Sequence, residues 1–384
     1  MTDFLTIFRP RGLLHMRCTL LAPLVKRWSL GLLTTMTLLA GATASRADIL
    51  FTEYGSNGSL SAVKRVTDAG APVWTRTVNL DGPTGIVTDS SGNVYVANTG
   101  RALGSGPFNS TILKYNSAGT LTNTFNLTLN SAPLGLAIGP DGFLYASATN
   151  GTPPPPGQLA TATNQIFRIN PNNGTFATWS TAGPGGPVPT IQFPVPTAPL
   201  NYAGIAFDSS GRLYVADYFR NRIDRYDTNG AYLGVFTANA QLDGPYGLAF
   251  DRFGNLIVSN SSKLVVNPVD KILAFDSNGN FITTLQNQFP TLYLPAGIAF
   301  DNSGNLLVAN NAASLNGQGS IVKLQINYTG STPTGTTNLG AVLTGLNGPV
   351  FLAVPEPASV ILAGIGVVGV LTIGVRLRRK AADA

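Results

Sequence analysis

The chain has 384 residues, with 24 basic and 18 acidic side chains and a formal net charge of +6. Residues 1–47 and 355–384 contain ten of the basic and three of the acidic side chains. Segment 48–354 therefore has 14 basic and 15 acidic side chains and a net charge of −1. This segment has no basic footprint of the kind that nucleic-acid binding requires. The single His and single Cys are His15 and Cys18, so the segment has no triad of the Ser-His-Asp type, no Cys/His zinc site and no disulfide.

The N-terminal 47 residues have the pattern of a secretory signal peptide. Basic residues between positions 9 and 27 precede an apolar stretch over 28–40, and Ser45 and Ala47 are small residues at −3 and −1 of a cleavage site. We expect cleavage after Ala47. Because the basic region is long, initiation at Met16 is the alternative start. Cys18 lies before the apolar stretch, which argues against a lipoprotein anchor.

One pattern of about 17 residues then occurs five times, with two short β-rich runs around a turn that ends in Gly, usually Asp-x-x-Gly. The inner glycines Gly85, Gly135, Gly204, Gly247 and Gly297 are 50, 69, 43 and 50 residues apart. Such periods indicate solenoids or propellers, and the longest spacing indicates an insertion. A second pair of β-rich runs follows in most copies. Four antiparallel strands per repeat are typical of a β-propeller blade.

The two ends of the segment supply a sixth blade. Residues 348–354 match the first strand of a repeat, with Phe351 in the glycine position, and residues 49–53, 61–66 and 72–78 match the other three. Pairing of the terminal strands would leave no long open edge. We therefore predict an all-β fold, a six-bladed β-propeller of four-stranded blades over 48–354, with a ring closed by the N- and C-terminal strands.

The run Leu213–Asp227 (LYVADYFRNRIDRYD) resembles the NHL repeat. Segment 48–354 as a whole resembles the NHL and SMP-30/gluconolactonase group of six-bladed propellers. The resemblance is specific for fold and weak for activity, since propellers have many unrelated functions.

The predicted strand order separates two faces. The four strands of a blade are lettered a to d from the innermost outward. The a–b and c–d turns within each blade are short and open on one face. The b–c connections, and the d–a connections that lead to the next blade, open on the other face. We assign all long connections to the second face, namely 99–110, 149–164, 180–200, 261–269, 311–320 and 330–347. Loops on a rigid scaffold often carry function, so this is the predicted binding face. The alternative is unconstrained variation in loop length.

The residues that end the second strand of each blade open onto this predicted binding face. Five of them have oxygen-bearing side chains and are the candidate ligand-binding residues: Glu53, Asn98, Asp217, Asn260 and Asn310. A ring of such oxygens could hold Ca²⁺. The alternative is that each side chain caps its own b–c turn, with Asp217 also pairing with Arg222.

The lactonase activity of the resembled group meets an obstacle. Those enzymes carry Asn or Asp metal ligands just before the inner-strand glycine, as the resemblance implies. Here the residues at these positions are Thr84, Leu134, Ala203, Tyr246, Ala296 and Val350. None is a good ligand for a hard cation, so we predict no catalytic residues and no firm metal site.

The C-terminus carries a second targeting signal. Pro355-Glu356-Pro357 precede an uncharged apolar stretch over 358–375, followed by the basic residues Arg376, Arg378, Arg379 and Lys380. At about 1.5 Å per residue the stretch is just long enough to cross a hydrocarbon core of about 30 Å as a transmembrane helix, with the basic residues on the cytoplasmic side. The order of these parts resembles the PEP-CTERM sorting signal, whose partner is an exosortase-type protease. A plain membrane anchor is the alternative.

These features predict three regions: a signal peptide (1–47), the propeller (48–354) and a sorting and anchor segment (355–384). We expect an exported binding or scaffold module of the bacterial cell envelope, first held in the inner membrane facing the periplasm and then at the cell surface or in the matrix. Its predicted partners are a polysaccharide or another envelope protein. The alternatives are a calcium-dependent, SMP-30-like lactonase and a mainly structural matrix protein. Because the closing strand ends at the tight-turn face, that face should lie toward the membrane.

Intact-mass measurement of the protein from envelope fractions tests export directly. The expected mass corresponds to a chain that begins at Asp48, because the signal peptide is removed after Ala47. A mature protein that still begins at Met1 or Met16 would contradict the assignment.

Overall fold

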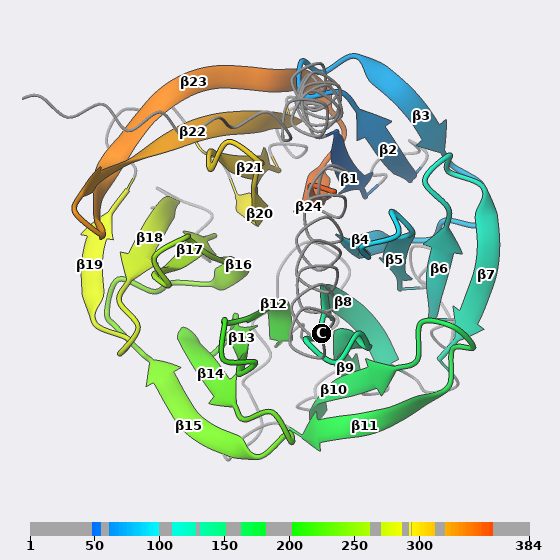
Figure 1. Cartoon of the computed structure of the whole chain (residues 1–384), viewed down its shortest axis with the longest axis horizontal. Coiled ribbons are helices and arrows are strands. Elements are labelled where there is room, and N and C mark those ends of the chain that lie inside the picture. The colour runs from blue at the N-terminus through cyan, green and yellow to red at the C-terminus, as the bar shows by residue number, and fades with distance from the viewer. Residues whose placement is uncertain are drawn as a thin grey trace, which may run out of the picture. The chain divides into compact units, whose positions relative to one another are not determined.

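The computed structural model describes residues 48–54, 61–99, 110–127, 131–150, 163–181, 202–261, 270–285, 292, 294–311 and 319–355, all within one compact unit, Arg46–Ala384. Six four-stranded antiparallel sheets are arranged as the blades of a ring (Figure 1). The innermost strands contact one another in the order β24, β4, β8, β12, β16, β20 and back to β24. The predicted six-bladed propeller is confirmed.

Each blade is named here from its innermost strand outward. Blade I contains β24 (Pro349–Ala353), β1 (Ile49–Glu53), β2 (Ala62–Val66) and β3 (Pro72–Arg76). Blade II contains β4 (Pro83–Thr88), β5 (Val94–Asn98), β6 (Thr111–Tyr115) and β7 (Leu121–Asn126). Blade III contains β8 (Ser131–Ile138), β9 (Leu144–Asn150), β10 (Thr163–Ile169) and β11 (Phe176–Thr181).

The second half of the ring has the same order. Blade IV contains β12 (Tyr202–Phe207), β13 (Leu213–Asp217), β14 (Arg222–Tyr226) and β15 (Tyr232–Thr237). Blade V contains β16 (Pro245–Phe250), β17 (Leu256–Asn260), β18 (Lys271–Phe275) and β19 (Phe281–Thr284). Blade VI contains β20 (Pro295–Phe300), β21 (Leu306–Asn310), β22 (Gly319–Thr329) and β23 (Thr332–Leu346).

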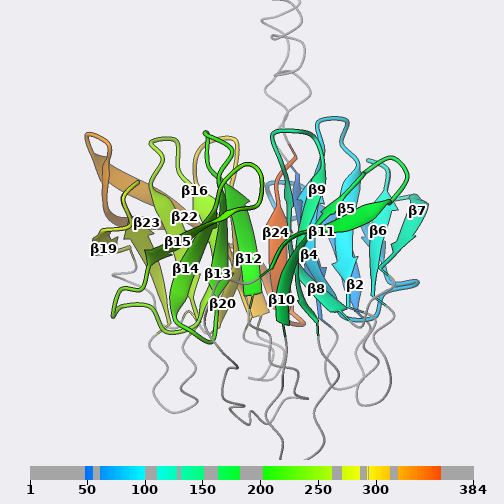
Figure 2. The same cartoon turned by 90° about the horizontal axis from the view of Figure 1, so that it is seen from below.

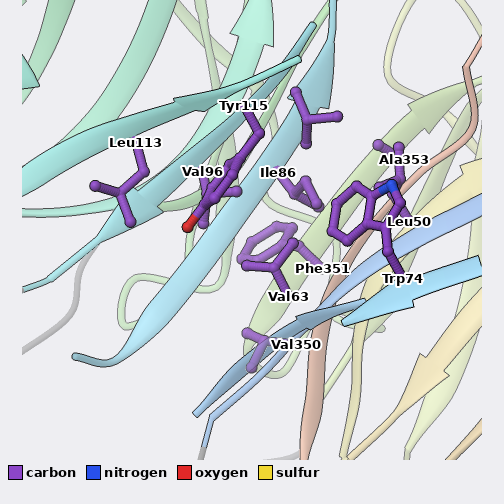
Figure 3. Close-up of a cluster of buried hydrophobic side chains, with 11 residues drawn as sticks. Leu50, Val63, Trp74, Ile86, Val96, Leu113, Tyr115, Val350, Phe351 and Ala353 are labelled. Atoms are coloured by element: carbon purple, nitrogen blue, oxygen red, sulfur yellow. The ribbon is translucent and has the colours of Figure 1, made fainter. Parts of the chain in front are cut away.

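Burial along the strands follows their place in the blade. The second strands, such as β5 and β21, are buried at every position, because they lie between two strands and between two neighbouring blades. The outermost strands are largely exposed; in β7 only Phe125 is buried. One cluster of buried side chains lies at the contact between blades I and II and includes Val63, Trp74 and Phe351 (Figure 3).

The Asp-x-x-Gly turns are stabilised by their own aspartate. In blade II the Asp89 Oδ1 atom accepts hydrogen bonds from the backbone N–H groups of Ser91 and Asn93, both at 2.9 Å, and Oδ2 accepts one from the Tyr95 hydroxyl at 3.0 Å. Gly92 closes the turn with φ of 77°, a conformation that glycine adopts without strain. The carboxylate is thus used within the turn.

Neighbouring blades meet at the inner-strand glycines. A Cβ atom on Gly204 would lie 2.5 Å from the carbonyl oxygen of Tyr246 in blade V, and one on Gly135 would lie 2.5 Å from that of Ala203 in blade IV. Both distances are too short for any side chain. The backbone of one inner strand therefore lies directly against the backbone of the next, which only glycine permits.

Hydroxyl groups reinforce this approach in alternate blades. Ser147 Oγ accepts a hydrogen bond from Gly135 N–H at 2.9 Å and donates one to the Ala203 carbonyl of the next blade at 2.6 Å. Thr52 in blade I and Ser259 in blade V make the same bridge to Thr84 and Ala296. The matching positions in blades II, IV and VI are Ala97, Ala216 and Ala309. We call this arrangement the hydroxyl bridge.

The predicted connection over 330–347 is wrong. This segment is strand β23, which pairs with β22 from Thr329↔Thr332 to Gly319↔Leu346. Its Gly- and Thr-rich composition resembles that of a loop, but its Thr, Val and Leu residues favour an extended strand. The pairing is irregular near Gly340 and Gly345, whose φ angles are 98° and 68°. The segments 100–109, 151–162, 182–201, 262–269 and 312–318, in the other predicted long connections, lie outside the described residues.

The ring is closed as expected, by β24 beside β1. The register joins Leu50 to Ala353 and Phe51 to Leu352, and all five residues of β24 are buried. Figure 2 shows β24 ending at the upper face, the face of the a–b and c–d turns.

Two truncations test the closure. A chain that ends at Asn347 lacks β24, exposes β1 as an edge and loses the burial of five side chains. The loss of about 1.5–3 kcal/mol for each large apolar side chain is comparable to the whole stability of a domain, about 5–15 kcal/mol. We expect no cooperative thermal unfolding for this chain. A matched chain that ends at Pro355 should unfold cooperatively, and equal melting temperatures would contradict the role of β24.

Candidate functional site

The predicted ligand ring lies at equivalent positions in five blades. Its members end strands β1, β5, β13, β17 and β21, and their side chains are Glu53, Asn98, Asp217, Asn260 and Asn310. All five are buried, with exposed fractions of 0–6%. The sequence thus predicted their common place correctly, and the structure shows what each one contacts.

Three members hold the connection that leads into the inner strand. Asn98 Oδ1 accepts a hydrogen bond from Asp81 N–H at 2.7 Å, and Asn260 Oδ1 accepts one from Asp243 N–H at 2.7 Å. Glu53 accepts a weaker one from Asn347 N–H at 3.4 Å and pairs with Lys64 at 2.7 Å. These side chains cap the d–a connection, and the b–c turns of their own blades, where capping was predicted, lie outside the described residues.

Asp217 caps its own b–c turn, as expected. Its carboxylate accepts a hydrogen bond from Arg220 N–H at 3.2 Å and pairs with the Arg220 guanidinium at 2.8 Å. Arg222 Nε lies 3.5 Å from the same carboxylate, so the predicted contact between Asp217 and Arg222 is confirmed. These pairings neutralise a carboxylate that is fully buried.

These contacts tie the ring residues to the backbone and to cations of their own blades. Among the described residues there is no group of three or more His, Cys, Asp or Glu side chains that could hold a metal ion. A calcium site at the ring Glu53/Asn98/Asp217/Asn260/Asn310 therefore stays a prediction, without support from the contacts of its members.

A tyrosine on an inner strand makes contacts with several blades. Tyr246 occupies the position just before the inner-strand glycine of blade V, where the other copies have Thr, Leu, Ala, Ala and Val. Its ring centroid lies 5.4 Å from that of Phe351 in blade I, with an angle of 34° between the rings. Blade VI lies between these two blades (Figure 1), so the contact joins the inner strands of two blades that are not neighbours.

Tyr246 packs against three separate core clusters, formed at the contacts of blades I and II, IV and V, and VI and I. One large side chain therefore joins the inner strands of several blades. Burial raises the pKa of Tyr246, and the phenols of Tyr218 and Tyr54 add to the increase. These three tyrosines thus lie close enough to influence one another's charge.

Tyr54 and Tyr218 lie at the mouth of the channel. Each directly follows a second strand, β1 or β13, and each ring covers a glycine of the next blade: a Cβ on Gly82 would lie 2.9 Å from the Tyr54 ring, and one on Gly244 would lie 2.7 Å from that of Tyr218. The Tyr218 ring meets Tyr246 edge-on at 6.3 Å. We call Tyr54, Tyr218, Tyr246 and Phe351 the aromatic mouth; its three tyrosines are partly exposed.

Acidic side chains border the aromatic mouth. Burial raises the pKa of Tyr218 to about 12, with further increases from the carboxylates of Asp243 and Asp270. Asp270 is 7% exposed and accepts a hydrogen bond from Leu294 N–H at 2.7 Å. The mouth thus has aromatic rings and carboxylates close to one another.

Blade IV contains a second polar cluster, buried beside blade III. The Asp224 carboxylate accepts hydrogen bonds from Tyr202 and Tyr232 at 3.2 and 3.1 Å and pairs with Arg222 at 3.0 Å. Burial raises the pKa of Asp224 despite the nearby Arg222. Asp224 and Tyr202 are 0% exposed, so no ligand can reach them, and the cluster serves to connect the strands of the blade.

The sequence analysis considered Tyr246 only as a position that lacks a metal ligand, and it missed Tyr54 and Tyr218. The repeats did contain a signal for these residues. Before the inner-strand glycine, Tyr246 stands where the other repeats have Thr, Leu, Ala or Val. After the second strand, Tyr54 and Tyr218 stand where the other repeats have Thr, Ser or Asn. The contact across the channel depends on the diameter of the ring, which the pattern of one repeat does not reveal.

The C-terminal signal is the region that matches a known motif. Residues 353–380 match the PEP-CTERM protein-sorting motif. Of the predicted sorting residues, Pro355 is described; Glu356, Pro357, the apolar stretch 358–375 and the basic residues Arg376, Arg378, Arg379 and Lys380 lie outside the described residues, as does the predicted signal peptide. Where the structure is described, no helix is long and apolar enough to cross a membrane.

Solved structures share the fold. A protein of unknown function from Bacteroides caccae has a TM-score of 0.57 and 11% identity, covering 81% of this chain and 100% of that one. A chain of a nidogen/laminin complex has a TM-score of 0.52 and 15% identity, covering 81% and 98%. Regucalcin from Agrobacterium tumefaciens, a calcium-binding protein, has a TM-score of 0.45 and 15% identity, covering 65% and 74%. No curated protein matches the sequence.

These likenesses concern the fold alone. The protein is an exported β-propeller with a PEP-CTERM sorting motif, and this motif indicates anchoring to a membrane at the C-terminus. The resemblance to the NHL repeat stays a resemblance.

The tyrosines of the mouth predict sensitivity to alkali. The pKa of Tyr218 rises from about 10 in the unfolded chain to about 12 in the folded one, so the folded state holds the phenol proton more tightly. The contribution of Tyr218 to the free energy of unfolding is therefore complete below pH 10 and is lost between pH 10 and 12. For this partly exposed group we expect an effect on the order of 1–2 kcal/mol. Denaturant unfolding at pH 8 and pH 11 should show a smaller loss of stability for Tyr218→Phe than for the wild type. An equal loss would contradict the assignment.

Proposed function

We propose that this protein is a non-enzymatic binding module of the cell envelope whose aromatic mouth binds an extracellular polysaccharide. The observation that carries the proposal is the convergence of Tyr54, Tyr218, Tyr246 and Phe351 from three blades at one end of the channel. Aromatic faces pack against the C–H surfaces of sugar rings, and the phenol hydroxyl groups can bond to sugar hydroxyls.

Charge supports a neutral or weakly charged polymer. Asp243, which with the buried Asp270 raises the pKa of Tyr218, is only partly buried and can accept hydrogen bonds from sugar hydroxyls. The propeller segment 48–354 has a net charge of only −1, so long-range attraction to a polyanion is not expected. Affinity would then come from short-range contacts at the mouth.

The proposal includes a place for the module in the envelope. Export followed by retention in the inner membrane would present the ring to the periplasm. An exosortase-type protease acting at Pro355-Glu356-Pro357 would then release it to the cell surface or matrix. Strand β24 ends at Ala353, so a cut beyond Val354 would leave the ring complete.

Binding is tested with a chain ending at Pro355 and with exopolysaccharide from the native bacterium, by isothermal titration calorimetry. Tyr54→Ala and Tyr218→Ala should each weaken binding about tenfold, or ~1.4 kcal/mol, because each removes a stacking face. Tyr218→Phe, which keeps the ring, should retain most of the affinity. Tyr328→Ala, a tyrosine on the opposite face, is the matched control.

Each variant is first checked for cooperative thermal unfolding, so that loss of binding is not confused with loss of fold. Equal affinity of the wild type and of both alanine variants would contradict the proposed site. Retention of an envelope protein, with no polysaccharide binding, would identify the alternative partner class. Calcium-dependent lactone hydrolysis abolished by Asp217→Ala would replace the binding function with the alternative SMP-30-like activity.

A further inference from the structure

One tight turn differs from the others on its face. The two residues inside the a–b turn are Ser-Ser in blades II and IV and Asn-Ser in blade VI, but they are Arg252-Phe253 in blade V. Phe253 is 43% exposed, although a polar residue would suffice in a turn closed by Asp251 and Gly254. An exposed aromatic residue beside an arginine in a tight turn requires an explanation.

The long hairpin of blade VI brings a second aromatic ring to this turn. Tyr328, near the end of β22, lies 5.0 Å from Phe253 with the rings at 66°. The Arg252 guanidinium lies 4.7 Å from the centre of the Phe253 ring and 5.3 Å from that of Tyr328. Within the described part of the chain, Arg252 forms no ion pair with a carboxylate. We call Arg252, Phe253 and Tyr328 the aromatic–arginine patch.

The patch is held in place before any partner arrives. Asn255 Nδ2 donates a hydrogen bond to the Ser331 carbonyl at the tip of the hairpin at 2.9 Å. Farther along the hairpin, Thr336 Oγ1 donates one to the Leu285 carbonyl of blade V at 2.8 Å. The hairpin extends to the upper face in Figure 2, where β24 also ends.

Strand β24 connects this face to the membrane signal. It ends at Ala353, and the sorting motif begins at the same residue. Only Val354 and Pro355 therefore separate the ring from the Glu356-Pro357 that lead into the apolar stretch 358–375. While the anchor is intact, the tight-turn face, including the patch, must lie close to the bilayer surface.

We propose that the aromatic–arginine patch docks onto the headgroup region of a bilayer that contains anionic lipid. Aromatic side chains are favoured at the boundary between headgroups and hydrocarbon. The planar guanidinium of Arg252 can donate paired hydrogen bonds to a lipid phosphate, and a negative surface attracts it. The patch lies in only one sector of the ring, so docking would orient the ring about the anchor instead of leaving it free to rotate.

Tryptophan fluorescence in the full-length protein, reconstituted in phosphatidylcholine/phosphatidylglycerol vesicles, tests the docking. Phe253→Trp places a reporter in the patch, and the signal of the native tryptophans is subtracted. Nitroxide-labelled lipids should quench this reporter at least about twofold more strongly than the matched reporter Ser303→Trp, which lies in the equivalent turn of blade VI. Adding Arg252→Glu, or omitting phosphatidylglycerol, should remove most of the difference.

Equal quenching of the two reporters would overturn the proposal. Unchanged quenching after Arg252→Glu would also overturn it, because the lipid phosphate would then not be recognised. Ala240→Trp reports from the opposite face, and stronger quenching there would show that the ring is inverted. None of these results depends on polysaccharide binding at the aromatic mouth.

Discussion

The close contact between neighbouring inner strands is the constraint on which the rest of this propeller depends. Because Gly135 and Gly204 have no side chain, the carbonyl groups of Ala203 and Tyr246 approach at backbone distance. The hydroxyl bridges of Thr52, Ser147 and Ser259 fasten three of the six contacts. With the radius of the inner ring set by these contacts, the residue before each glycine is directed to the small space at the centre. A single tyrosine there is enough to reach an inner strand two blades away, and the aromatic mouth depends on that spacing.

Much of this architecture was predictable from the sequence, since each blade is a local unit with its own apolar pattern. The bounds of β1 and the closure by β24 follow from matching the chain ends to the repeat. What one repeat cannot show is contact between blades that are not neighbours, such as Tyr246 with Phe351. Likewise, β23 resembles a loop in composition, and it is a strand only because the long β22 offers it a partner.

The ring residues end equivalent strands, as predicted, and their oxygens have partners within the protein. Asn98, Asn260 and Asp217 do end equivalent strands, but their oxygens accept hydrogen bonds from Asp81, Asp243 and Arg220. A buried side chain that stabilises the entry to the next strand has the same residue preference as a ligand to a hard cation. Polar residues repeated at strand ends are therefore weak evidence for a metal site, whereas one aromatic residue that breaks the repeat is better evidence for a specific function.

The pairing of β1 with β24 also has a consequence for the time at which the domain can fold. The first strand of the ring finds its partner only when the last strand has been exported, so the pairing joins residues at the two extremes of the domain. Contacts between such distant positions form slowly. Blades II to VI can assemble one after another as they emerge, but β1 waits, with its apolar side chains uncovered, until translocation is nearly complete. Closure of the ring by β24 is therefore the last step in the folding of the domain.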